Sequence, residues 1–137
     1  AEGRRDASLG GSVQEFVEHD NGLVAMEAVR ALNRLGWRED SDWLEKACAH
    51  RDPEVVKEAI SGCLAWPVET VRPILVAALQ SPLWDVRMAA TKAIGSIDDP
   101  ELKRAILERV QAEEDDMVRE KMEYIIGGSD SGSDGDR

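Results

Sequence analysis

Apolar residues recur along this chain at a spacing that predicts helices. In four segments an apolar residue occupies the first, fifth, eighth and ninth place. Steps of four, three and one put all four side chains on a single stripe of a helix. The stripes begin at Val24, Val56, Val86 and Val118, which are 32, 30 and 32 positions apart. Such regular recurrence predicts stacked repeats rather than an irregular helical bundle.

Each interval between two stripes leaves room for one further helix. These first helices are expected at residues 42–48, 68–79 and 100–110, with a short equivalent at 13–17. The pattern therefore predicts an all-α fold of four two-helix repeats, or eight helices. Neither helix of such a pair can bury its stripe alone, so stability is expected to come from stacking on the neighbouring repeat.

Turn-forming residues mark the ends of these helices. Capping residues stand before prolines at Asp52-Pro53, Ser81-Pro82 and Asp99-Pro100, an arrangement typical of a helix start. Gly36, Gly95 and Gly127 follow second helices, where a left-handed C-cap is expected. The repeat domain is expected to span residues 12–127. A flexible segment at 1–11 and a disordered acidic Gly/Ser/Asp tail at 128–137 are expected to flank it.

The third repeat carries a family resemblance. Its second helix, Trp84 to Gly95 with the sequence WDVRMAATKAIG, resembles that of a HEAT repeat, in the HEAT-like class shared with phycobilin lyases. Weaker matches are Val118-Arg119, Lys57 in place of the arginine, and Arg72-Pro73 in a first helix. The resemblance implies a right-handed α–α superhelix, or solenoid, whose second helices line a concave face. It implies little about activity, because fold does not fix function.

The charge of the chain limits the classes of partner. There are 28 acidic against 17 basic Lys and Arg residues, a net charge of −11. Because an acidic surface repels phosphate, we expect neither nucleic acid nor an anionic membrane as a partner. The acidity favours a protein partner with a basic surface, or simply solubility. No apolar run approaches the ~20 residues of a membrane-spanning helix.

Two cysteines are too few for a disulfide framework, and we expect a cytoplasmic protein. The sequence begins with Ala rather than Met, so we expect either a removed leader or a fragment of a longer protein. A monomer or a domain of a larger protein fits both.

No catalytic arrangement or cofactor motif is apparent, so we expect a non-catalytic protein without a cofactor. A metal site of Cys48, His50 and Cys63 can be drawn, but it lacks a fourth ligand. Cys63 falls on an apolar stripe, where cysteine behaves as a small hydrophobe. The acidic cluster at 113–116 can be interpreted as a calcium or basic-peptide site. Its alternative interpretation, favoured here, is that acids complement the positive end of the next helix.

Tryptophan and arginine residues occupy recurring places in the repeats. Trp37 and Trp66 occupy equivalent places and are expected to pack at junctions, whereas Trp43 is assigned to the convex stripe and Trp84 to the rim of the concave face. Arg87 and Arg119 share one place in adjacent repeats, and each is expected to pair with an acid such as Asp85 or Asp116. Such exposed pairs contribute about 1 kcal/mol or less.

The favoured function is an adaptor or scaffold that binds another protein or peptide through the concave face. The candidate residues are those off the apolar stripes of the second helices: Met26, Arg30, Asn33, Glu58, Ser61, Trp84, Met88, Thr91, Lys92, Glu120, Glu123 and Tyr124. An ordinary solvated face is the competing interpretation. A role like that of phycobilin lyases, or another enzyme-associated subunit, is the alternative function. DNA binding ranks third, because the charge has the wrong sign.

Overall fold

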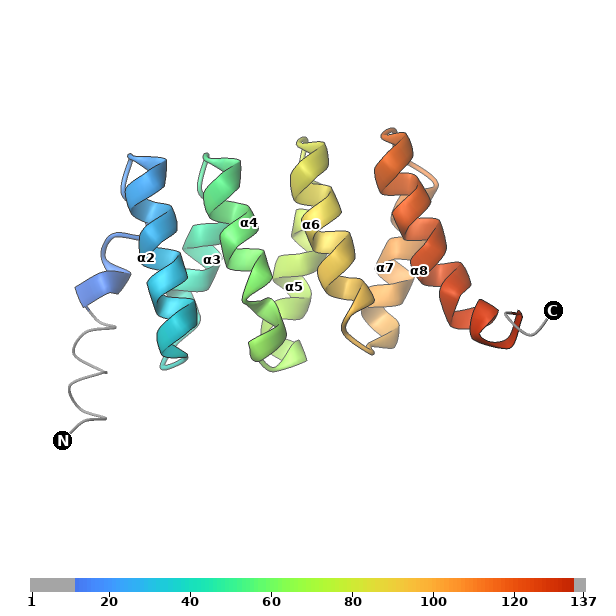
Figure 1. Cartoon of the computed structure of the whole chain (residues 1–137), viewed down its shortest axis with the longest axis horizontal. Helices are drawn as coiled ribbons and strands as arrows, with labels where there is room; N and C mark the ends of the chain where they lie inside the picture. The colour runs from blue at the N-terminus through green and yellow to red at the C-terminus, as the bar shows by residue number, and fades with distance from the viewer. Residues whose placement is uncertain (1–11, 135–137) are drawn as a thin grey trace. The chain divides into compact units, whose positions relative to one another are not determined.

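The computed structural model describes residues 12–134, and side chains as far as residue 127. Within this range every regular element is a helix, as the apolar spacing predicts (Figure 1). The chain divides into two compact units, residues 1–70 and 71–137. The boundary falls inside α5 (Val68–Ala78).

The first unit holds α2 (Gly22–Leu35), α3 (Asp42–Cys48), α4 (Pro53–Ser61) and the short 3-10 helix η1 (Cys63–Ala65). Residues 12–14 are helical as well and stand in the place of a first helix. The second helices α2 and α4 pack side by side, with α3 against α4. Both begin at the same end of the unit, at the top of Figure 1. Their facing sides bury Ala25, Val29, Leu32, Val55, Ala59 and Ile60.

The second unit holds most of α5, then α6 (Trp84–Gly95), α7 (Pro100–Val110) and α8 (Asp116–Asp134). Here too the second helices, α6 and α8, pack side by side and begin at one end of the unit, while α7 packs on α8. Pro73 lies inside α5, as expected of this first helix. The core of the unit includes Leu75, Val86, Ala90, Ile94, Leu102, Ile106, Val118 and Met122.

A repeated loop defines the register of the four repeats. One residue accepts a hydrogen bond from the backbone N–H two positions later, and that later residue is the N-cap of the second helix or directly precedes the helix. The accepting residues are His19, His50, Ser81 and Glu113, at N···acceptor distances of 3.0, 3.0, 3.1 and 3.0 Å. Their spacing is 31, 31 and 32 residues. The second helices therefore start at equivalent places: Gly22, Pro53, Trp84 and Asp116.

This register corrects the alignment of the second repeat. The sequence pattern aligned Val56 with Val86 and Lys57 with Arg87, but the helix starts pair Val55 with Val86 and Val56 with Arg87. Both valines are buried. Because two consecutive apolar residues fit the same stripe, periodicity alone could not choose between them.

Three of the six predicted helix boundaries are confirmed. Asp52 and Asp99 are N-caps whose carboxylates accept the N–H groups of Glu54 and Leu102. Gly36 ends α2 in the left-handed region at φ 67°, a conformation that favours glycine.

The other three boundary predictions are wrong. Ser81-Pro82 does not cap a helix, because Leu83 is the N-cap of α6 and Ser81 serves as the loop acceptor. Gly95 is the last residue of α6 rather than its left-handed cap, and α8 continues through Gly127. A glycine after an apolar stripe marks a close contact as readily as a helix end. The proposed disorder of residues 128–137 stays a prediction, and 1–11 lie outside the described residues.

Glycine marks close contacts between second helices in both units. A Cβ on Gly62, the C-cap of α4, would lie 2.2 Å from Oδ1 of Asn33 on α2. A Cβ on Gly95 of α6 would lie 2.8 Å from Cδ1 of Ile125 on α8. Counted from the helix starts, Asn33 and Gly95 are equivalent, and so are Gly62 and Ile125. In the first unit the glycine at the contact comes from the later of the two second helices, whereas in the second unit it comes from the earlier one.

Candidate functional site

Five of the twelve candidate residues form one network in the first unit. Arg30 of α2 binds Glu58 of α4 through Nη2 and Oε1 at 3.3 Å, and the same nitrogen lies 3.8 Å from the sulfur of Met26. The carbonyl oxygen of Glu58 accepts hydrogen bonds from Asn33 and Ser61, at 3.2 and 2.7 Å. The hydrogen bond and charge of Glu58 raise the pKa of Arg30. These polar groups already have partners, and the contacts of Arg30 and Asn33 with Glu58 join α2 to α4.

The candidates in the second unit are more accessible, with one exception. Trp84 at the start of α6 is 51% exposed, and Tyr124 of α8 is 69% exposed. Lys92, Glu120 and Glu123 are exposed as well, and Met88 is partly exposed. The exposure of Trp84 agrees with its expected place at a rim.

Thr91 is the exception, and its assignment to a binding face is wrong. Its side chain is fully buried, and its hydroxyl donates to the Arg87 carbonyl oxygen at 2.8 Å. Thr91 shares its helical place with the buried residues Val29 and Ile60. The sequence pattern assigned too few places of the second helix to its buried stripe, and so left Thr91 on the exposed face.

Arg87 does not form the exposed ion pair that the sequence predicts. Its guanidinium is buried and binds the Glu113 carboxylate through Nε–Oε1 and Nη2–Oε2, both at 2.9 Å, rather than Asp85 or Asp116. Its remaining nitrogen Nη1 donates to the Ser81 carbonyl oxygen at 2.8 Å. Arg87 thus connects the loops of two successive repeats and is not available to a ligand.

Glu113 is held as a carboxylate by this arrangement. Burial acts to raise its pKa, but hydrogen bonds from Arg87 and the Asp115 N–H, with the charge of Arg87 and a hydrogen bond from Arg109, outweigh burial. The net shift of the pKa of Glu113 is downward. In the same cluster Asp115 accepts the Val118 N–H at 3.0 Å. These contacts support the structural interpretation of residues 113–116 over a calcium or peptide site.

Arg119 occupies the same helical place as Arg87. It donates to the Glu113 carbonyl oxygen at 3.0 Å and pairs with Asp116. In the first unit the equivalent places hold Ala25 and Val56, and there the loop carbonyl of His19 accepts from His50 Nε2 at 2.8 Å. A histidine in the first unit and arginines in the second unit thus donate to the carbonyl oxygen of the loop acceptor residue.

The proposed metal site gains no support from the geometry. His50 Nδ1 accepts the Asp52 N–H, so Nε2 carries the proton and donates to His19; both ring nitrogens are engaged. Burial raises the pKa of Cys48 and of Cys63 to about 12, so both are thiols near neutral pH when no metal is bound. Among the described residues no group of three metal-binding side chains comes together.

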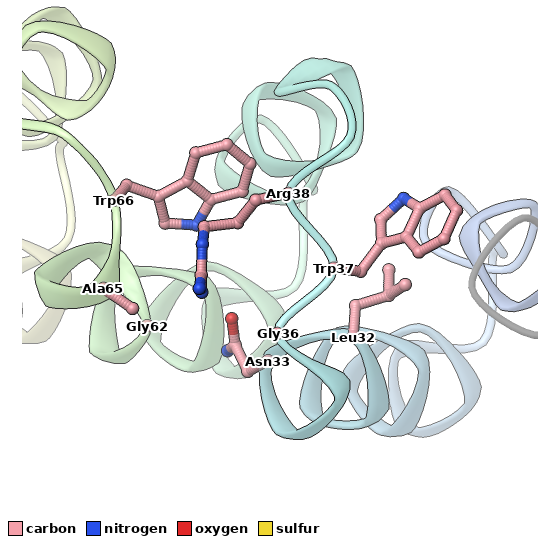
Figure 2. Close-up of a pocket in the computed structure, with 8 residues that line it drawn as sticks. All are labelled: Leu32, Asn33, Gly36, Trp37, Arg38, Gly62, Ala65 and Trp66. Atoms are coloured by element: carbon pink, nitrogen blue, oxygen red, sulfur yellow. The ribbon is translucent and has the colours of Figure 1, made fainter. Parts of the chain in front are cut away.

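Two tryptophans of the first unit, Trp37 and Trp66, border a small pocket that the sequence did not reveal. It has a volume of about 40 Å³ and is formed by the end of α2, the loop after it and the end of α4 (Figure 2). Its lining residues are Leu32, Asn33, Gly36, Trp37, Arg38, Gly62, Ala65 and Trp66.

Each tryptophan can be compared with its expected place. Trp37 and Trp66 are half-buried, and Trp37 donates from Nε1 to Gln14 at 3.1 Å, so both pack at junctions and also border the pocket. Trp43 is buried rather than displayed on an outer stripe, with its ring 5.9 Å from that of Trp66. Arg38 was not among the candidates; its only sequence signal is its place directly after Gly36-Trp37.

Comparisons with known proteins give one result. The family model described as HEAT repeats matches residues 41–126. No curated protein matches the chain, and no solved structure does. None of the described helices is both long enough and apolar enough to cross a membrane. With a matching family model over more than half of its length, and with second helices in register from loop to loop, the chain belongs to the family of HEAT-repeat proteins.

Proposed function

We propose that this chain is a non-catalytic binding module, an adaptor or scaffold, that holds a partner protein on the second helices α6 and α8. HEAT repeats in general bind other proteins on extended surfaces built from successive repeats. The absence of catalysis and a cytoplasmic location belong to the same proposal.

The observation that carries the proposal is the exposure of large apolar side chains on these two helices. Trp84 begins α6, while Met117 and Tyr124 lie on α8, and each is at least half exposed. The two helices pack side by side, so these side chains belong to neighbouring elements. Aromatic and methionine side chains are enriched at the centres of protein interfaces.

Charge around these side chains defines the chemistry of the partner. Glu120 and Glu123 are exposed on α8 and have no ion pair within the described part of the chain, whereas Lys121 lies over the ring of Tyr124 at 5.2 Å. The acidity of the whole chain acts in the same direction. A partner segment with apolar side chains flanked by Lys or Arg therefore fits this surface, and its association would be faster at low salt.

The first-unit candidates contribute less to this proposal. Arg30, Asn33 and Glu58 already bind one another, so a partner would have to break these contacts before making its own. For that reason we propose that contacts with α6 and α8 supply most of the binding free energy.

Affinity capture from an extract of the source cells tests the proposal. Trp84→Ser and Tyr124→Ala remove exposed apolar side chains of α6 and α8, and Met88→Glu places a charge on α6, one turn after Trp84. Leu107→Ser is the matched control, because Leu107 is 53% exposed on the first helix α7. We expect a specific protein on the unchanged chain and on Leu107→Ser, and its loss from the other three. Equal capture by all four variants would remove the assignment.

No specific observation favours the alternatives. The pocket of about 40 Å³ is far smaller than the ~300 Å³ or more of a typical small-molecule site, so it does not suit a tetrapyrrole. Net charge −11 disfavours DNA. A phycobilin-lyase-like role therefore rests on resemblance alone.

A further inference from the structure

The pocket at the ends of α2 and α4 is bordered by a cation, Arg38, that the proposed function does not use. Arg38 follows the left-handed turn at Gly36 and folds back toward the helix that it has just left. A Cβ on Gly36 would lie 3.7 and 3.8 Å from the two terminal nitrogens of Arg38. Figure 2 shows the guanidinium between Trp66 and Asn33.

Two other polar groups of the pocket are already engaged. Asn33 donates from Nδ2 to the Glu58 carbonyl oxygen at 3.2 Å, and Trp37 donates from Nε1 to Gln14 at 3.1 Å. Arg38 has neither a hydrogen bond nor an ion pair within the described part of the chain, although most arginines of that part do. Arg38 is exposed, so the five donors of its guanidinium face solvent at the edge of the pocket, with no acceptor among the described residues.

The walls of the pocket determine what this guanidinium can bind. Leu32, Ala65 and the indoles of Trp37 and Trp66 are mainly apolar, so the guanidinium is the charged group that a ligand meets here. A carboxylate is the group whose two oxygens match the fork of a guanidinium. The volume of about 40 Å³ exceeds the ~30 Å³ share of one water and suits one such group, with the rest of the ligand outside.

We propose that this pocket binds one carboxylate of a partner protein, either an Asp or Glu side chain or the terminal carboxylate of its backbone, through Arg38. The inference rests on the proposed function, since the carboxylate is a partner's. The acidic field of the protein opposes the approach of an anion, but salt screens it beyond ~8 Å at physiological strength. Contact with Arg38 then decides whether a carboxylate binds at this pocket.

Peptide titrations followed by NMR of the tryptophan indole N–H signals test this pocket. Three probes share the sequence acetyl-Gly-Leu-Gly-Leu: one with a free C-terminus, one with a C-terminal amide, and one amide with a central Glu replacing Gly. We expect the indole signals of Trp37 and Trp66 to shift with the first or third probe and not with the plain amide. A response to the first alone identifies a terminal carboxylate, and to the third alone an acidic side chain.

Variants at two neighbouring arginines make the titration specific. Arg38→Gln is expected to weaken binding at least about tenfold, and Arg38→Lys, which keeps the charge but not the fork, to weaken it less. Arg34→Gln is the control, because Arg34 is exposed at the end of α2 and does not line the pocket. Its affinity should change less than about twofold.

Three results would overturn the carboxylate site: equal binding of the plain amide, unchanged affinity of Arg38→Gln, or no shift with either acid up to millimolar concentrations. Circular dichroism must show that the variants are as helical as the unchanged protein. The titration needs no captured partner. Its failure therefore leaves the result for α6 and α8 standing, and a failed capture leaves the titration unaffected.

Discussion

Arg87 and Glu113 form a two-pronged ion pair that is almost completely removed from water. Their side chains are 9% and 0% exposed, and two N–O distances of 2.9 Å join them across 26 positions of sequence. The same arginine donates to the Ser81 carbonyl oxygen. Because Glu113 also accepts the N–H of Asp115 before α8, this pair fixes both the junction and the start of the last helix.

Replacing the acid of this pair is expected to destabilise the second unit strongly. Glu113→Gln leaves the Arg87 charge buried without its counter-ion, which should cost about 3 kcal/mol of unfolding free energy. Urea unfolding monitored by circular dichroism measures this loss. The neighbouring Glu114→Gln, which changes an exposed acid, should change the free energy by less than about 0.5 kcal/mol. Similar values for the two variants would contradict the account.

Acid should destabilise the protein through Glu113 and Asp99. Hydrogen bonds from Arg72 first, then the N–H of Leu102 and the charge of Arg72, lower the pKa of Asp99 despite its burial, and the pKa of Glu113 is lowered as well. The unfolded state therefore binds protons more readily than the folded state. The stabilisation is present above the ordinary carboxyl pKa of about 4 and is lost as pH falls through the lower folded values.

Unfolding free energies measured between pH 7 and pH 3 test this dependence. The unchanged protein should lose stability as the pH falls below about 5. Asp99→Asn should be less stable at neutral pH and show a shallower fall. If Asp99→Asn and Glu113→Gln both lost stability with the same slope as the unchanged protein, other acids would control the pH response.

Two glycines that the sequence pattern treated alike should respond in opposite directions to alanine. Gly36 has φ 67°, so Gly36→Ala should cost about 1 kcal/mol. Gly127 lies inside α8 with open space around a Cβ, so Gly127→Ala should stabilise by about 0.5–1 kcal/mol. Thermal unfolding of both variants measures the difference. Destabilisation by Gly127→Ala would mean that the helix ends at this glycine.

The close contact between α2 and α4 predicts a coupled pair of substitutions. Gly62→Ala drives a methyl group into the Asn33 side chain and should cost about 1–3 kcal/mol. Asn33→Ala in the same protein removes the obstacle, so the double variant should recover part of this loss. A double-mutant cycle by urea unfolding gives the coupling energy, and strictly additive effects would argue against the contact.

The repeat architecture was predictable because each apolar stripe reports directly on burial. Four regularly recurring stripes, with a proline after Asp52 and after Asp99, were enough to predict stacked pairs of helices. The one-residue error at Val55 and Val56 arose where two apolar residues are adjacent. The loop acceptors resolve it, but His19, His50, Ser81 and Glu113 share no side-chain chemistry beyond an acceptor atom, so no sequence motif marks them.

The candidate surface was less predictable, because exposure depends on the neighbouring helix. Thr91 and Lys92 are adjacent in sequence, yet one is buried and the other exposed. Arg38 follows a glycine that turns the backbone back over α2, and that return depends on the φ of Gly36. Its place in the pocket therefore could not be inferred from residue types alone.

Photo-crosslinking at position 124 tests the central claim, that a partner lies on the second helices, most directly. A photoreactive p-benzoylphenylalanine replaces Tyr124 of α8, and in a separate variant it replaces Leu107 of α7; both positions are exposed. On irradiation in an extract of the source cells, we predict a discrete adduct from position 124 and none from position 107. An adduct from position 107 alone, or none from either position, would contradict the account.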